Sequence, residues 1–242
     1  MIKIHKLIKS AGTWVYLKFL ILIGFRRLFN LKTKFVFSQT GEDMILYMLL
    51  RDIRDNDLFY IDVGCNDPIH DSNTFLFYLN GGSGICIDGN KSLIDKHKKI
   101  RTRDISICSL VSDEVEEVTF YISKENRVST ASKEVMINNS KRWEFGDKQN
   151  LKTRTLNEIL DSNLPKGQAI HLLSIDVEGY DFKVLKSIDL EQYQPRVIVI
   201  EMHSFSLDPD FLKSDEVILY LQSYGYSLKY YATFNAYFVR TA

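Results

Sequence analysis

The sequence predicts an α/β fold in which a mostly parallel β-sheet carries helices on both faces. Short apolar segments alternate with amphipathic ones along most of the chain, and the last two apolar segments lie close enough together for a hairpin. The composition agrees with this, because 242 residues that are 45% hydrophobic and 26% charged are typical of a globular chain with a sizeable core. A mainly disordered protein, a fibrous repeat and a polytopic membrane protein are therefore excluded.

The first half of the chain begins with a predicted helix over residues 38–50. Ser38 or Thr40 can cap this helix, and Glu42 and Asp43 suit the positive end of its dipole. The apolar segments that follow are short and bounded by turn residues, which is typical of buried strands. The predicted strands of this half are 58–63, 85–88, 105–111 and 118–122, and its further helices are 74–79 and 91–99.

The second half contains one polar segment before the alternation resumes. Residues 124–149 lose periodicity and have Trp143 and Phe145 as their only aromatic side chains, so we expect a loop or lid there. Thr233–Asn235 separates the last two strands, which predicts an antiparallel hairpin. The remaining predicted helices are 155–160, 182–188 and 216–224, and the remaining strands are 170–175, 196–201, 226–231 and 236–240.

The charge of the chain is unevenly distributed. Residues 1–41 contain eight basic side chains and no acidic one, although the whole chain has 31 of each. This leaves 23 basic against 31 acidic side chains, a net charge of −8, in the rest. We therefore expect a basic amphipathic arm at 1–34 and one catalytic domain at 35–242. The neutral total gives no indication of nucleic-acid binding.

The most hydrophobic stretch, Trp14 to Phe25, lies in this arm. As a helix it would extend ~18 Å, which is short of the ~30 Å hydrocarbon core of a bilayer. An Arg-Arg pair follows it where a signal peptide needs small residues. An interfacial helix that meets anionic lipid through its basic residues fits these features, and so does a helix packed on the main domain. Lys9 and Lys18 disfavour a single membrane span over about 8–29.

The cysteines indicate the compartment. Cys65, Cys86 and Cys108 form no CxxC pair, and their odd number provides no disulfide framework. This predicts a reducing, cytoplasmic environment, peripheral at the inner face of the membrane if the arm binds lipid.

A candidate ligand-binding loop, Asp62 to Asp67, follows the first predicted strand. Ligands of parallel sheets bind outside the carboxyl ends of the strands, where Gly64 would let a ligand approach the main chain. A glycine at such a junction can equally serve conformation alone. Asp88 ends the second strand, 26 residues after Asp62. A carboxylate there can accept both hydroxyls of a ribose, in NAD or in S-adenosylmethionine.

The loop itself distinguishes these two cofactors. Dinucleotide sites use GxGxxG to seat a pyrophosphate on a helix N-terminus, whereas residues 64–69 read GCNDPI and lack the second and third glycines. Asp67 stands where an anion would bind, and with Asp62 it suits a sulfonium cation that carries an ammonium group. The loop therefore favours S-adenosylmethionine. The chain also lacks GxxxxGK[ST], which excludes a P-loop.

Several segments occur in a recognisable order across about residues 36–202: SQTGED (38–43), YIDVGCNDP (60–68), SNT (72–74), GICID (84–88), RTL (154–156), LSIDVEG (173–179), VLK (184–186) and VIE (199–201). In this pattern the chain resembles the FkbM family of S-adenosylmethionine-dependent methyltransferases. Two departures are visible. Family members usually have Glu-Pro where this chain has Asp88-Gly89, and commonly a Gly-Trp pair where it has Gly82-Ser83. The first departure shortens the carboxylate side chain but keeps it.

The resemblance implies a class I, Rossmann-like methyltransferase fold with a seven-stranded, mostly parallel sheet. It also implies O-methylation, typically of sugars in polysaccharides, glycolipids or glycosylated natural products. S-adenosylmethionine is then the expected cofactor. The residues that we expect to bind it are Gln39, Asp62, Gly64, Asn66, Asp67, Asn73, Asp88, Ser109 and Asp176.

A second polar group follows the two predicted strands that end at residues 175 and 201. Asp176 and Glu178 should lie on the same sheet edge as the first loop, together with Asp181, Glu201 and His203. Asp181 is better explained as a helix cap. Asp176 and Glu178 follow a very apolar strand, so if they are buried they require partners.

Methyl transfer to a sugar hydroxyl requires a positioned base, because the hydroxyl is a poor nucleophile whereas a sulfonium donor is already activated. His203 is the first candidate, since its unperturbed pKa is ~6.5, although a lone histidine is more often structural. Asp176 is the second candidate, and Glu178 would hold the substrate or polarise His203. His70, beside the donor loop, is the rival of His203. Asp176 and Glu201 could also hold a divalent cation such as magnesium, which the sequence does not require.

Three functions remain open at this point. The leading one is a sugar O-methyltransferase that acts on a glycan or lipid-linked intermediate. The second is a catalytically silent, membrane-associated binding module that kept the fold. A NAD-linked oxidoreductase is the least favoured, because the glycines of a dinucleotide site are missing.

Overall fold

The computed structural model describes Leu17, Ile21 and residues 36–124 and 128–241. Most of the predicted arm at 1–34 therefore lies outside the described residues, and Leu17 and Ile21 are helical and exposed. Within the described part of the chain, no helix combines the length and the hydropathy that crossing a membrane requires.

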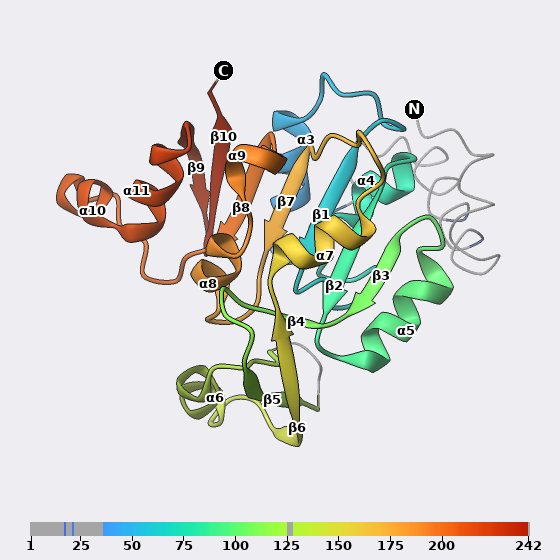
Figure 1. The fold of residues 1–242 in the computed structure, drawn as a ribbon, viewed down its shortest axis with the longest axis vertical. Coiled ribbons are helices and arrows are strands. Elements are labelled where there is room, and N and C mark those ends of the chain that lie inside the picture. The colour runs from blue at the N-terminus through green and yellow to red at the C-terminus, as the bar shows by residue number, and fades with distance from the viewer. Residues whose placement is uncertain (1–16, 18–20, 22–35, 125–127, 242) are drawn as a thin grey trace.

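Seven strands of the described residues form one sheet in the order β3-β2-β1-β7-β8-β10-β9 (Figure 1). The strands β3, β2, β1, β7 and β8 pair in parallel, and β10 runs antiparallel to both β8 and β9. This confirms the predicted seven-stranded, mostly parallel sheet with a C-terminal antiparallel hairpin. The strands are β1 (Phe59–Val63), β2 (Ser83–Asp88), β3 (Ile105–Cys108), β7 (Leu172–Ile175), β8 (Val197–Glu201), β9 (Tyr226–Ala232) and β10 (Asn235–Arg240).

Helices cover both faces of this sheet, and each face has its own apolar core. Side chains of α7, α8 and α11 pack on one face, and those of α3, α4 and α5 pack on the other. Because the central strands are buried on both faces, their sequences are apolar almost throughout. The helices are α3 (Glu42–Leu49), α4 (Phe75–Asn80), α5 (Lys91–Ile100), α7 (Leu156–Asn163), α8 (Asp181–Lys186) and α11 (Glu216–Ser223).

The first helix is shorter than its predicted span of 38–50. Gly41, with a left-handed φ of 99°, precedes it, and no side chain caps it. Ser38 instead lies one turn upstream and donates a hydrogen bond to the Asp43 carboxylate at 2.9 Å. Two further short helices were not predicted, α9 (Leu190–Tyr193) and α10 (Pro209–Ser214).

The prediction of a loop at 124–149 is wrong in part, because the described residues of this segment contain α6 (Lys133–Asn139) and the first half of β6 (Phe145–Arg154). The strand β6 pairs antiparallel with β5 (Glu117–Ser123) and in parallel with β4 (Leu110–Val111), which makes a small second sheet. Figure 1 shows this sheet and α6 at the bottom of the view, apart from the main sheet.

The strand predicted over 105–111 is divided between the two sheets. Residues up to Cys108 extend the main sheet beside β2, and those from Leu110 belong to β4. Ser109 lies at the break, where its N–H donates to the Asp88 carbonyl at 3.0 Å. The predicted strand 118–122 likewise belongs to the small sheet and not to the main one. The chain thus passes from one sheet to the other beside the end of β2.

Candidate functional site: a pocket at the carboxyl ends of the strands

A pocket opens where the carboxyl ends of β1, β2, β7 and β8 face the small sheet. The ends of the parallel strands contribute most of its polar groups, and the small sheet contributes an apolar wall with Leu110 and Phe120. Of the residues predicted to bind or react, those that line the pocket are Gln39, Gly64, Asn66, Asp88, Ser109, Asp176, Glu178 and Glu201.

Left-handed backbone is concentrated around this pocket. The described residues include five non-glycine residues with positive φ, and three of them, Asn66, Asp71 and Glu178, line the pocket. Such a conformation costs a residue with a Cβ about 1–2 kcal/mol. Residues held this way cluster at functional sites, where the surrounding structure over-determines them.

Asp88 is fixed in place at the end of β2. Its two carboxylate oxygens accept hydrogen bonds from the backbone N–H of Asn66 at 3.0 Å and of Asn90 at 2.7 Å. Burial raises the pKa of Asp88 to about 6, although the two N–H donors oppose this. Each oxygen accepts only one of these bonds and keeps a further lone pair, so the group can still accept hydrogen bonds from a ligand.

Gly64 is required by the packing of the sheet itself. It has a left-handed φ of 81°, and a Cβ at this position would lie 1.7 Å from the Asp176 carbonyl oxygen. The loops after β1 and β7 therefore meet at this glycine. Conformation and packing therefore explain why a glycine stands at position 64, and close approach of a ligand is not needed to explain it.

Asp62 does not line the pocket. It lies in β1, buried, and accepts a hydrogen bond from the Thr74 hydroxyl at 2.5 Å. Burial raises its pKa, and the nearby Arg101 guanidinium opposes the shift. The structure thus brings Asp88 and Asp176 together at the pocket and places Asp62 behind it.

Asp67, Asn73 and His70 also lie outside the pocket lining. Asp67 accepts hydrogen bonds from the backbone N–H of Ile69 and His70, which closes a turn, and Asn73 donates to the Ser174 hydroxyl at 3.1 Å. His70 is exposed. These residues shape the loop between β1 and α4.

Carboxylates converge at the ends of the neighbouring strands β7 and β8. Burial raises the pKa of Asp176 well above its usual range, and the nearby Glu201 and Glu178 carboxylates add to the shift. Burial and the Glu201 carboxylate also raise the pKa of Glu178 to about 8. Asp181 accepts hydrogen bonds from the backbone N–H of Val177 at 3.0 Å and of Gly179 at 2.9 Å, so it organises this loop. The prediction that it caps the helix is wrong, because Tyr180 is the N-cap of α8 and no side chain caps that helix.

His203 lies beside this group and not in the pocket lining. Its Nε2 is 3.3 Å from Glu201 Oε1, and its side chain is 57% exposed. The hydrogen bond with Glu201 raises the pKa of His203. The ring also makes an edge contact with Phe234, with ring centroids 5.2 Å apart.

Sequence reasoning missed the part of the pocket that the polar segment supplies. Arg142 and Trp143 line it, as do residues 128, 129 and 131. The Thr130 hydroxyl donates to the Glu178 carbonyl at 2.7 Å, which fastens this segment to the loop after β7. Trp143 was a usable signal, because a large aromatic side chain in an otherwise polar segment requires an apolar contact.

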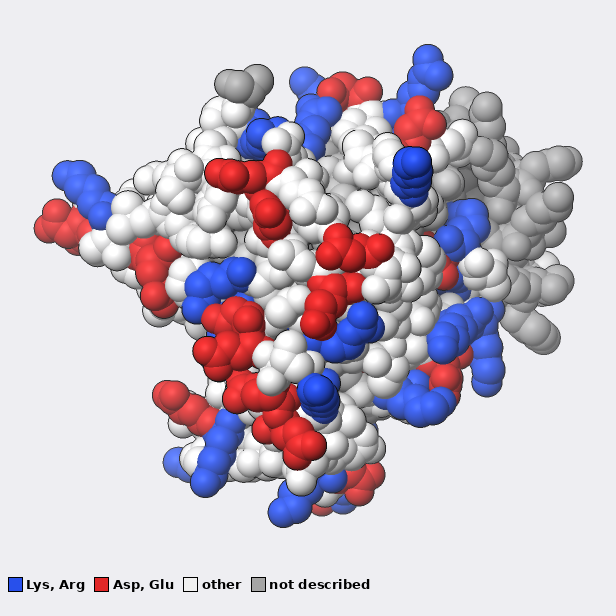
Figure 2. All heavy atoms as spheres, viewed as in Figure 1, with Lys and Arg blue, Asp and Glu red and all other residues white. Residues whose placement is uncertain are grey.

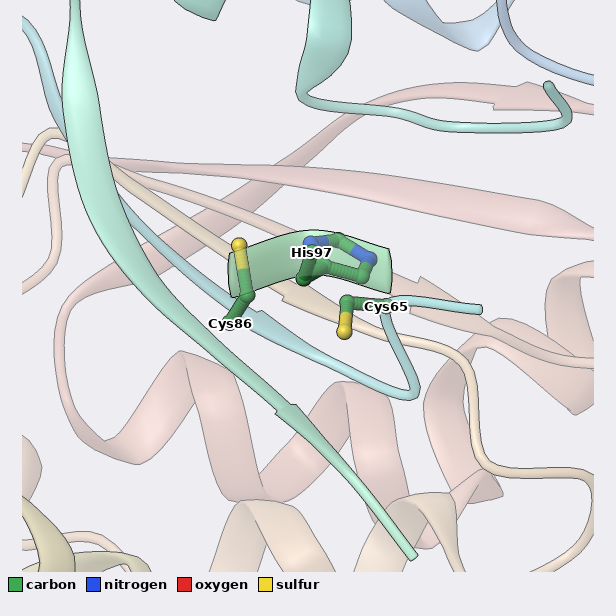
Figure 3. A group of neighbouring side chains, drawn as sticks. All are labelled: Cys65, Cys86 and His97. Atoms are coloured by element: carbon green, nitrogen blue, oxygen red, sulfur yellow. The ribbon is translucent and has the colours of Figure 1, made fainter. Parts of the chain in front are cut away.

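A second cluster of potential ligands lies behind the donor loop. Figure 3 shows Cys65, Cys86 and His97, all buried, which come from the end of β1, from β2 and from α5. His97 Nε2 donates to the Asn66 carbonyl at 2.9 Å, and burial lowers the pKa of His97 to about 4. The positive charge of Arg101 contributes to that shift and disfavours a further cation here. The cluster therefore supports the backbone of the pocket loop.

The strand order, the pocket at the carboxyl edge and the acid at the end of β2 define a Rossmann-like class I methyltransferase fold. The family model described as the methyltransferase FkbM domain matches residues 62–228, and the chain belongs to this family. No curated protein and no solved structure matched. The matched region includes β7 and β8, whose ends carry the clustered carboxylates, and excludes Gln39.

Proposed function

We propose that the protein transfers a methyl group from S-adenosylmethionine to a hydroxyl of a sugar in a glycan, a glycolipid or a glycosylated metabolite. The observation that carries this proposal is the presence of Asp88 and Asp176 in one pocket, at the ends of the strands on either side of β1. Membership of a methyltransferase family supports the reaction type.

The residues of the pocket fit S-adenosylmethionine. Asp88 keeps acceptor capacity for the two ribose hydroxyls, and Leu110 and Phe120 offer an apolar surface for a purine. Asp176 and Glu178 line the same pocket, and a sulfonium or ammonium group bound beside them would favour their ionised forms, which burial disfavours in its absence. When bound, this cofactor supplies an activated methyl group.

The same residues disfavour the dinucleotide alternative. A pyrophosphate would meet the carboxylates of Asp88, Asp176, Glu178 and Glu201, whereas among the described residues Arg142 is the only lysine or arginine in the lining. Like charges at short range repel strongly in a partly buried site. A NAD-linked activity is therefore the weaker candidate.

The acceptor hydroxyl must lose its proton as its oxygen forms the new bond to the methyl carbon, while the bond between that carbon and the donor sulfur breaks and the donor leaves as a thioether. Asp176 lines the pocket and is better placed to take this proton than His203, which lies outside the lining. Glu178, in the same lining, would orient the hydroxyl. A positioned base contributes ~10²–10⁴-fold, and approximation of the reactants can contribute more.

Calorimetry tests the donor. The full chain should bind S-adenosylmethionine and not NADH, and Asp88→Ala should weaken donor binding at least about tenfold, since it removes a charged hydrogen-bond acceptor. Asp95→Ala is the matched control, because Asp95 is paired with Lys91 on the surface of α5. Binding of NADH alone would contradict the proposal.

A catalytically silent binding module would bind the donor as an enzyme does, but it would not transfer the methyl group. Labelled methyl groups from the donor should appear on cellular glycans when the full chain is added. Tight donor binding without any such transfer would support the silent module instead.

A further inference from the structure

Three potential metal ligands meet at one side of the pocket. Glu178 follows β7, Glu201 ends β8 and His203 comes two residues later. One ligand atom from each lies within 4.8 Å of the other two, and Glu201 Oε1 is 3.3 Å from His203 Nε2. One ion can bridge such a set after a side-chain rotation, because metal–ligand bonds are about 2.0–2.2 Å long.

Glu201 has an unused acceptor in this group. Its side chain is only 10% exposed, and Oε1 is taken up by His203. Among the described residues, its second oxygen Oε2 is buried without a hydrogen-bond partner. A buried carboxylate oxygen without a partner is costly, and it points to a cationic ligand that completes the site.

Among the described residues, the acids around Glu201 have no lysine or arginine partner. Burial raises the pKa of Asp176 and of Asp181, and the nearby Glu201 carboxylate raises both further. Within the described part of the chain, no ion pair links Asp176, Glu178 or Asp181 to a lysine or arginine. Asp181 accepts two backbone N–H groups and supports the loop, and it is not one of the three residues whose ligand atoms meet.

We propose that Glu178, Glu201 and His203 bind a divalent cation of the manganese or zinc kind. The imidazole favours a transition-metal ion such as zinc over calcium or magnesium, which prefer oxygen ligands alone, and the two carboxylates suit manganese as well as zinc. The ligand set differs from the Asp176–Glu201 pair that the sequence allowed without requiring it, and the exposed His203 provides access from solvent.

The function of this cation rests on the proposed methyl transfer. Three protein ligands leave coordination positions open toward the pocket that Glu178 and Glu201 line. Hydroxyl oxygens of a sugar could occupy them, which would hold the acceptor beside Asp176 and make its proton easier to remove. The substrate class is therefore one with two neighbouring hydroxyls.

Titration with Mn²⁺ tests the site without any turnover. The full chain is first stripped of metal with a chelator. When Mn²⁺ is then added, about one ion per chain should bind, which lowers the electron paramagnetic resonance signal of free Mn²⁺ by that amount. Glu201→Gln and His203→Ala should each weaken this binding at least tenfold, because each loses one ligand. Asp95→Asn, which changes an acid outside the pocket, should bind like the wild type. Because the side chain of His203 is exposed, we expect His203→Ala to fold like the wild type.

Two results would overturn the site: no saturable Mn²⁺ binding by the wild type, or equal affinity in the wild type and both ligand variants. Donor calorimetry on the same samples separates this from the proposed function. Donor binding without Mn²⁺ binding would reject the metal site alone. Mn²⁺ binding that is lost in the variants, without donor binding, would support the site and reject the methyl transfer.

Discussion

Arg101 is a fully buried cation that holds the region behind the pocket together. It pairs with the buried Asp104 at 2.9 Å and donates to the hydroxyls of Tyr60 at 3.0 Å and Thr74 at 2.8 Å. Thr74 in turn donates to Asp62. This network explains why Asp62 is buried in β1 and does not reach the pocket.

Removal of the Arg101 charge should destabilise the fold strongly. Arg101→Met would leave the Asp104 carboxylate buried without its cation, and breaking such a pair costs about 3–5 kcal/mol. Urea unfolding of the full chain measures the loss. Arg196→Met is the matched control, because its pair with Asp52 is exposed and should matter little. Equal stability losses in both variants would show that burial does not control the effect.

Asp88 should make donor binding depend on pH. Burial raises its pKa to about 6, so Asp88 becomes protonated below that pH. The neutral carboxyl group is a weaker hydrogen-bond acceptor for the ribose hydroxyls than the carboxylate. Donor affinity should therefore fall about tenfold for each pH unit below 6. Calorimetry from pH 5 to 8 checks this.

The Asp88→Asn variant isolates this effect. Asp176, Glu178 and Asp181 also have raised pKa values and lie near the donor site, so they contribute their own pH dependence. The wild type should lose affinity below pH 6 more steeply than the variant. Parallel profiles would assign the pH dependence to the other acids.

The sequence predicts the place of a residue where that place follows from its position at the end of a strand. It does not predict the place of a residue that is held by buried partners from other parts of the chain. Asp88 ends β2 and Asp176 follows β7, the parallel strands on either side of β1, so topology alone brings them to the pocket. The place of Asp62 depends on Arg101 and Thr74, which are distant in sequence and meet it only in the folded chain. No local pattern contains that information.

At the scale of elements, the sequence predicts those strands and helices that bury an apolar face, because the burial leaves a periodic pattern of apolar residues. The strand β6 escaped prediction because most of its residues are exposed, so its sequence has no period of two. The helix α6 has no buried residue, and its seven residues are too few for a clear helical period. The strand β6 is held by its pairing with β5, a long-range contact that the pattern of apolar and polar residues does not encode.

The junction between β1 and β7 should tolerate no side chain at Gly64. Gly64→Ala would add left-handed strain and a clash with the Asp176 carbonyl, so it should cost at least about 3 kcal/mol or prevent folding. Gly167→Ala has a similar φ of 74° but nothing within 4 Å of the new Cβ, so it should cost only about 1–2 kcal/mol. Urea unfolding compares them. Equal costs would mean that φ alone explains Gly64.

At the scale of the whole molecule, acidic and basic side chains are interspersed on the face in Figure 2. Two ion pairs tie α8 to the segment between β4 and β5, Lys186 with Asp113 at 2.6 Å and Lys183 with Glu116 at 3.7 Å. They link α8, which packs on the main sheet, to the connection between the small-sheet strands β4 and β5. The excess of basic charge in residues 1–41 therefore contrasts with a body of mixed sign.

This asymmetry leads to a prediction about membranes. We propose that residues 1–34 bind an anionic bilayer surface, where each lysine or arginine contributes about 1 kcal/mol. In the full chain, the paired change Arg26→Gln and Arg27→Gln should then weaken sedimentation with phosphatidylglycerol vesicles by about 2 kcal/mol, or roughly thirtyfold. Neutral phosphatidylcholine vesicles should bind both forms weakly, and added salt should reduce the difference.

The paired change Lys98→Gln and Lys99→Gln is the matched control, because it removes the same charge from exposed positions on α5. If net charge alone attracts the chain to the vesicles, both pairs of substitutions should weaken binding equally. If the arm is the contact surface, only the change at Arg26 and Arg27 should do so, since a charge more than a Debye length (~10 Å at 0.1 M salt) from the lipid is screened. A chain of residues 35–242 that sediments as well as the full chain would contradict the membrane role of the arm.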